Sequence, residues 1–125
     1  MTKLQALLFV AVLSIILLVL HLVAITLSLY FIFPWFDLVM HALGGAAIGL
    51  LFVVLFGKGK EGTQRRYYIT ASIGALTLSF VWECIEYFSG ITFVTSTYSV
   101  DTFLDVGIGF LAAVIVARLT YRLTS

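Results

Sequence analysis

The sequence predicts an all-α membrane protein, a bundle of four transmembrane helices with both termini on the cytoplasmic side. Its 125 residues are 62% hydrophobic and only 10% charged, and the mean hydropathy is +1.18, whereas an average soluble domain is about 25% charged. This composition excludes a soluble globular domain, a disordered chain and a nucleic-acid-binding protein. The single cysteine, Cys84, excludes an internal disulfide.

Four apolar segments, within one domain covering residues 1–125, are each long enough to cross a bilayer. Residues 4–33 contain no Asp, Glu, Lys or Arg and exceed the ~20 residues that a bilayer needs, so this span is expected to tilt or to extend into the interface. Pro34 closes it. The other spans are expected at residues 37–57, 67–88 and 102–119, as helices, because unpaired backbone groups in lipid cost several kcal/mol.

The basic residues predict the direction of the bundle. With four spans, the N-terminus, the polar segment from Gly57 to Arg66 and the C-terminus share one side of the membrane. These three places hold all the basic residues: Lys3, Lys58, Lys60, Arg65, Arg66, Arg118 and Arg122. The positive-inside rule makes this side cytoplasmic, so we expect an N-in, C-in protein of the cell (inner) membrane.

Most acidic residues lie at the opposite, outer ends of the last three spans. Asp37 and His41 are four residues apart and therefore share one face of a helix. At 1.5 Å per residue, His41, Glu83 and Asp105 are expected at a similar depth. The full outer cluster consists of Asp37, His41, Glu83, Glu86, Asp101 and Asp105.

Small residues continue the same faces toward the inner side. His41 is followed at steps of four by Gly45 and Gly49, and Asp105 in the same way by Gly109 and Ala113. Such small-xxx-small faces let transmembrane helices approach closely. The acids are therefore expected to point into the bundle.

These acids need a positive partner, because ionised side chains inside a membrane are costly and usually functional. No Lys or Arg lies on their side. Three answers remain: protonated carboxyls, carboxylates that cap helix N-termini, or a divalent cation. Carboxylates mixed with an imidazole favour Zn, Mn or Fe. The predicted metal ligands are His41, Glu83, Glu86 and Asp105, and the candidate general bases are Asp37 and Asp101.

Each of these residues also has a structural interpretation. Asp37 follows Pro34 and is suited to cap the second span. Thr102 and Asp105 fit a capping box, and Glu86 is close enough to the interface to be solvated. A neutral ring hydrogen-bonded inside the bundle is the structural alternative for two histidines: His21 and His41.

The order of the motifs resembles the small bacterial and archaeal membrane proteins of the YjdF-like and VanZ-like type. The residues that carry the resemblance are Asp37, His41, Gly44, Gly45, Trp82, Glu83, Glu86, Tyr87, Asp101, Asp105 and Gly109. The Trp-Glu-x-x-Glu motif favours the YjdF-like side, since VanZ-like members carry an Asn where this chain has Gly109. The resemblance implies the fold and the site and gives no reaction.

Three functions are compatible with these residues. The first is a membrane-embedded metal site that acts on or binds a lipid-linked or envelope substrate. The second is an ion- or proton-coupled transporter, as a homo-oligomer, although transporter sites usually lie near the membrane midplane. The third is an assembly subunit of a larger membrane complex. The expected partners are the lipid bilayer, a lipid-linked small molecule and a second copy of the chain, and no nucleic acid.

Overall fold

The computed structural model describes residues 2–57, 62–90 and 97–124, and these form helices without strands. The helices long and apolar enough to cross a membrane are α1 (Lys3–Thr26), α3 (Trp35–Phe52) with its π-helical extension η1 (Val53–Gly57), α4 (Gln64–Ser89) and α5 (Tyr98–Thr124). A short helix, α2 (Leu29–Ile32), joins α1 to α3. The predicted class, a bundle of four transmembrane helices, is confirmed. Lys58 and Lys60, which helped to predict the topology, lie outside the described residues.

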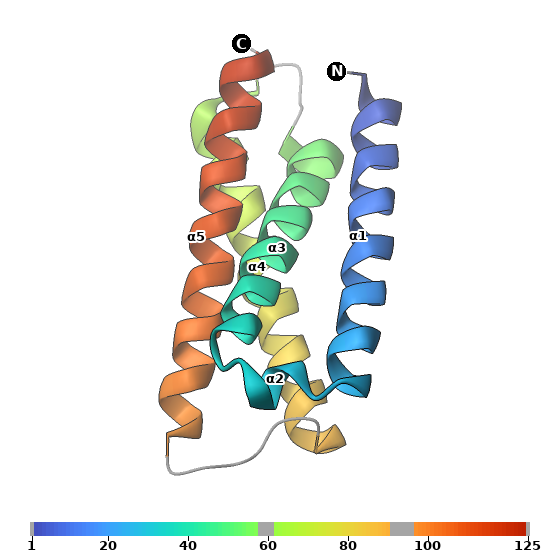
Figure 1. The fold of residues 1–125 in the computed structure, drawn as a ribbon. Helices are drawn as coiled ribbons and strands as arrows, with labels where there is room; N and C mark the ends of the chain where they lie inside the picture. The colour runs from blue at the N-terminus through green and yellow to red at the C-terminus, as the bar shows by residue number, and fades with distance from the viewer. Residues whose placement is uncertain (1, 58–61, 91–96, 125) are drawn as a thin grey trace.

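Helix α3 occupies the centre of the bundle and packs against α5, α4 and α1 (Figure 1). Helix α1 begins and α5 ends at the same end of the bundle, while α2 lies at the other end. We call this other end the distal end. It corresponds to the outer side in the predicted topology.

Glycine and alanine hold α3 directly against α5. A Cβ atom on Gly45 would overlap the backbone carbonyl oxygen of Gly109, and one on Gly49 would lie 2.7 Å from the Cα atom of Ala113. Close backbone approach of this kind is what small residues permit between transmembrane helices. The predicted small-residue packing faces are confirmed.

Local sequence features start and end several of the helices. Thr2 and Gln5 form a capping box at the start of α1, which satisfies two backbone N–H groups that no helical carbonyl reaches. The Thr63 hydroxyl accepts a hydrogen bond from the Arg66 backbone N–H at the start of α4. Gly90, with φ of 64°, ends α4 in the left-handed conformation that glycine adopts without strain.

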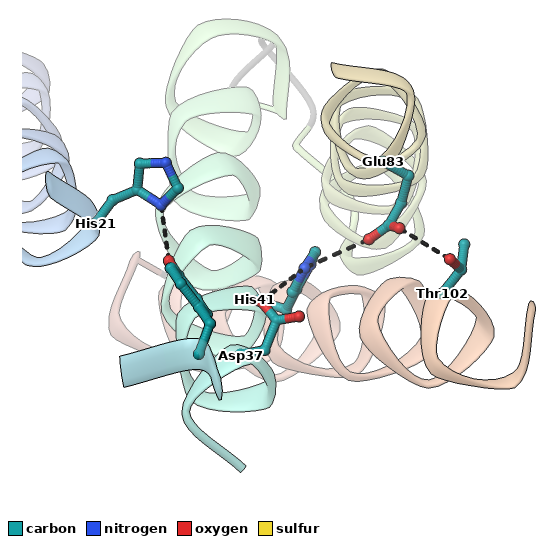
Figure 2. A network of polar contacts seen from close by, with 6 residues as sticks. His21, Asp37, His41, Glu83 and Thr102 are labelled. Carbon is teal, nitrogen blue, oxygen red and sulfur yellow. Dashed lines mark hydrogen bonds and ion pairs between the residues drawn. The ribbon is translucent and has the colours of Figure 1, made fainter. Parts of the chain in front are cut away.

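The expected first span, residues 4–33, is too long as a single helix. Helix α1 ends at Thr26, and Ser28 adopts a left-handed conformation with φ of 54°. The Thr26 hydroxyl donates to the carbonyl of Leu22 at 2.7 Å, a bond that bends helices. A 2.7 Å hydrogen bond between the Tyr30 hydroxyl and His21 Nδ1 then holds α2 against α1 (Figure 2).

His21 is therefore a hydrogen-bonded packing residue, as its structural interpretation predicted. Its ring also packs edge-on against Trp82 of α4, with centroids 5.0 Å apart. Burial, together with the charges of Asp37 and Glu86, raises the pKa of the Tyr30 hydroxyl above its usual range, so this hydroxyl stays protonated.

Removing the Tyr30 hydroxyl is expected to loosen the distal turn. Tyr30→Phe deletes the bond to His21, and we expect a loss of about 1 kcal/mol in the free energy of unfolding, measured by thermal unfolding in detergent. Tyr87→Phe, at an exposed tyrosine of α4, is the matched control and should leave the unfolding temperature unchanged. Equal unfolding temperatures for both variants would contradict a structural role for the bond.

Candidate metal centre

Three helices bring the candidate ligands to one depth near the distal end. His41 lies six residues after Trp35, the first residue of α3, and Glu83 lies six residues before the end of α4. Asp105 lies seven residues after the start of α5. At 1.5 Å per residue, all three are about 9–11 Å from the distal helix ends. The depth predicted from spacing agrees with this arrangement.

The four predicted ligands point into the bundle. Exposure is 7% for His41, 6% for Glu83, 2% for Glu86 and 6% for Asp105. The interpretation of Glu86 as a solvated interfacial residue is therefore wrong. Its position at an inward turn of α4, three residues from Glu83, takes its carboxylate into the core instead of toward the membrane surface.

His41 lies between two carboxylates from different helices (Figure 2). Its Nε2 atom is 3.4 Å from Glu83 Oε1 and 3.6 Å from Asp37 Oδ1. Within the part of the chain that the structure describes, neither Nε2 of His41 nor Oε1 of Glu83 has a hydrogen-bond partner. An unsatisfied buried polar atom costs about 1–3 kcal/mol, so two such atoms facing each other indicate a place for a ligand.

Thr102 fixes the orientation of Glu83. Its hydroxyl donates to Glu83 Oε2 at 3.0 Å, which leaves Oε1 directed at His41 (Figure 2). The interpretation of Thr102 as the cap of a capping box is wrong, because α5 begins at Tyr98 and Thr102 lies inside the helix. The contact of Thr102 with Glu83 was not predicted from the sequence. The sequence feature that could have indicated this contact is the position of Thr102, one turn from Asp105 on the same helical face.

The ligand atoms fall into two groups that share His41. One group combines His41 with Glu83 and Glu86, and the other combines it with Asp37 and Asp105. Within each group the ligand atoms lie within 4.8 Å of one another. The structure therefore places Asp37, predicted as a general base, beside the predicted ligands, and it groups Asp105 with Asp37 and His41.

Asp37 and Asp101 occupy the first turns of their helices. The N-cap of α3 is Pro34, so the capping interpretation of Asp37 is wrong, although a negative charge in the first turn is still favourable. Asp101 is exposed and accepts a hydrogen bond from the Thr97 hydroxyl at 3.2 Å. It belongs to neither metal-ligand group found among the described residues.

A cleft of about 830 Å³ leads from the distal end to the cluster. Its polar lining includes Asp37, Glu83, Glu86, Asp101 and Asp105. Across residues 2–57, 62–90 and 97–124, no Lys or Arg forms an ion pair with these carboxylates. Carboxylates gathered in a poorly solvated site repel one another unless a cation or protons offset their charge.

The fold and the site together define a small four-helix membrane protein with a buried carboxylate–imidazole cluster at one end of its bundle. The chain belongs to the family of predicted membrane proteins described as DUF2238, whose sequence model matches residues 2–125. No curated protein and no solved structure matches the chain.

Proposed function

We propose that the cluster binds a divalent metal ion, Zn, Mn or Fe, through His41, Glu83, Glu86 and Asp105. His41, Glu83 and Glu86 form one group of ligand atoms, and Asp105 would reach the ion from the group that it shares with His41 and Asp37. The observation that carries this proposal is the pair of buried atoms, Nε2 of His41 and Oε1 of Glu83, that face each other at 3.4 Å without a hydrogen-bond partner among the described residues. A cation between an imidazole nitrogen and several carboxylate oxygens would satisfy both atoms and offset the charge of the acids.

The metal site would bind or act on a lipid-linked or envelope substrate at the outer face of the cell membrane. The cleft at the distal end gives access to the cluster, and N-in, C-in topology turns that end outward. A bound ion would polarise a phosphoryl or carbonyl oxygen of the substrate. Asp37, 3.6 Å from His41, and Asp101, at the mouth of the cleft, are the candidate general bases.

The resemblance to YjdF-like and VanZ-like proteins belongs to the same proposal. Its motif residues His41, Glu83 and Asp105 are among those that the fold gathers at the cluster. The family assignment places the whole chain among membrane proteins, which agrees with the resemblance at the level of class.

The packing beneath the cluster argues against the alternative of a transporter. Gly45 lies on Gly109 and Gly49 lies on Ala113, and further inward Ala75 and Ala117 have no exposed surface. These contacts hold α3 directly against α5 beneath the cluster, and small buried side chains line the region further inward. A path for ions would need polar groups that continue from the cluster to the opposite end.

The test is the metal content of the purified protein, wild type beside Glu83→Gln and Asp101→Asn. Each variant removes one carboxylate charge, the first from a buried residue of the cluster and the second from an exposed residue outside both ligand groups. We expect a stoichiometric transition metal in the wild type and in Asp101→Asn, and its loss in Glu83→Gln. A metal-free wild type that is correctly folded would refute the proposal.

Thr102 provides a further test, because it positions Glu83 without belonging to the ligand groups. Thr102→Val removes the hydroxyl that holds Oε2 and is expected to weaken metal binding about 10-fold, since such supporting groups typically contribute 10–100-fold. Thr97→Val, which removes a similar bond to Asp101, is the control. Titration calorimetry measures both, and equal affinities in the two variants would show that Thr102 does not support a ligand.

A further inference from the structure

A second cavity, of about 400 Å³, adjoins the cluster. Helix α3 forms its floor, and α1 and α4 form its walls. Asp37 and His41 line one end of it, while Leu17, Ile48 and Leu78 line the rest with apolar side chains. We call this cavity the lateral groove. Ile48 lies two turns, about 10 Å, from His41, so the groove runs along the helices away from the acids.

The packing of α1 explains why the groove exists. Near its start, Ala6 and Val10 pack into a small core with residues of α3 and η1, and near its end Ala24 is fully buried. Between these contacts, Leu17 and His21 on the same helical face are only half-buried. Helix α1 therefore contacts the bundle at both ends and leaves a space over the middle of α3.

The groove opens sideways between α1 and α4. Leu18 of α1 and Val81 of α4 both line it, and yet they are 57% and 45% exposed. In a membrane, the medium at this opening is the hydrocarbon of the bilayer. The rings of His21 and Trp82, 5.0 Å apart, connect the two walls nearer to the distal end.

We propose that the lateral groove binds one hydrocarbon chain of a membrane lipid whose phosphate headgroup lies at the metal-loaded cluster. The headgroup part rests on the proposed function, because carboxylates without a metal ion would repel a phosphate. At about 30 Å³ for each water-sized group, the groove accommodates about a dozen methylene groups. This is the size of one chain and too small for a lipid with two.

The junction between groove and cleft has the polarity that such a lipid needs. Tyr30 and Asp37 line both cavities. The Tyr30 ring, held through its hydroxyl by His21, presents an apolar face and a polar tip at the point where a chain would meet a headgroup. The groove and the cluster thus form one amphipathic site, apolar along α3 and polar at the distal end.

One position, Gly44, allows the groove to be filled without disturbing the backbone, and a second glycine, Gly107, serves as its control. A Cβ atom on Gly44 would meet nothing within 4 Å, and Gly44 lines the groove. Gly107 of α5 has the same open surroundings and does not line it. Gly44→Phe therefore blocks the groove, and Gly107→Phe is a control of the same chemistry.

The experiment uses the full chain in phosphatidylcholine nanodiscs with a lysophosphatidic acid that carries a diazirine on its chain. After illumination, mass spectrometry compares labelling at Ile48 and Leu78, in the groove, with labelling at Ile15 and Ile73, which are exposed elsewhere. We expect Gly44→Phe to lower groove labelling at least about tenfold. Excluding two methylene groups of the lipid chain from the groove already weakens binding by about this factor. Labelling at Ile15 and Ile73 should persist, and Gly107→Phe should resemble the wild type.

The metal content of the same samples separates this proposal from the proposed function. Groove labelling that is equal in Gly44→Phe and wild type, with metal bound in both, would overturn the lipid site alone. A monoacylglycerol probe lacks the phosphate. If it labels the groove as strongly as the lysophosphatidic acid probe does, the phosphate assignment is overturned. A wild type without metal whose groove labelling still falls in Gly44→Phe would overturn the metal centre and the headgroup assignment, and would support the chain site.

Discussion

Gly45→Ala is expected to prevent or severely weaken folding, whereas Gly44→Ala, at the adjacent residue, should not. A methyl group on Gly45 would overlap the carbonyl oxygen of Gly109 and lie 2.6 Å from its Cα atom. Both partners are backbone, so only a separation of α3 from α5 relieves the overlap. Overpacking typically costs 1–3 kcal/mol, and for a backbone clash we expect about 3 kcal/mol or more.

The matched control makes this effect specific to the helix interface. A methyl group on Gly44 would meet no atom within 4 Å, and alanine is favoured over glycine in a helix by about 1 kcal/mol. Thermal unfolding in detergent should place Gly44→Ala at or above the wild type and Gly45→Ala far below it. Similar unfolding temperatures for the two variants would show that α3 and α5 do not touch at Gly45.

His41→Ala is expected to abolish the stabilisation of the protein by metal. His41 belongs to both candidate ligand groups, so its removal disrupts either arrangement. A ligand at 100 times its dissociation constant stabilises the folded state by about 2.7 kcal/mol. Unfolding temperatures measured with and without added metal should therefore rise in the wild type and remain constant in His41→Ala.

The other histidine of the chain serves as the control. His21 hydrogen-bonds to Tyr30 and contacts Trp82, and it belongs to neither candidate ligand group of the described residues. His21→Asn should lower the unfolding temperature in the absence of metal, yet keep the increase when metal is added. A metal-dependent increase that survives in His41→Ala and disappears in His21→Asn would place the metal elsewhere.

Hydropathy predicted the four spans but not the interruption after the first one. Residues 4–33 are predominantly apolar and contain no Asp, Glu, Lys or Arg, and such a composition does not distinguish a long helix from two helices. The break depends on the left-handed conformation of Ser28 and on the bond from His21 to Tyr30. The first is a local conformational choice, and the second is a tertiary contact, so neither changes the hydropathy of the segment.

Spacing predicted much of the cluster because helices convert sequence distance into depth. As expected from depth, the structure brings Glu83 and Asp105 each close to His41, although they fall in separate ligand groups. Depth does not give the rotation of each helix about its axis, which decides that Asp105 lies with Asp37 and His41, whereas Glu83 and Glu86 together meet His41 from α4. The step of four from His41 did predict Gly45 for the packing face, where it meets Gly109, but it did not show that Gly44 faces open space.

The most direct test of the metal centre is the X-ray absorption spectrum of the metal bound to the purified wild-type protein. We expect oxygen and nitrogen ligands that include one imidazole, contributed by His41, and no sulfur at the ~2.3 Å typical of a zinc–thiolate bond. The imidazole signal should be absent from any metal that remains in His41→Ala. A protein that holds no metal, or a metal bound by Cys84 or His21, would contradict the account.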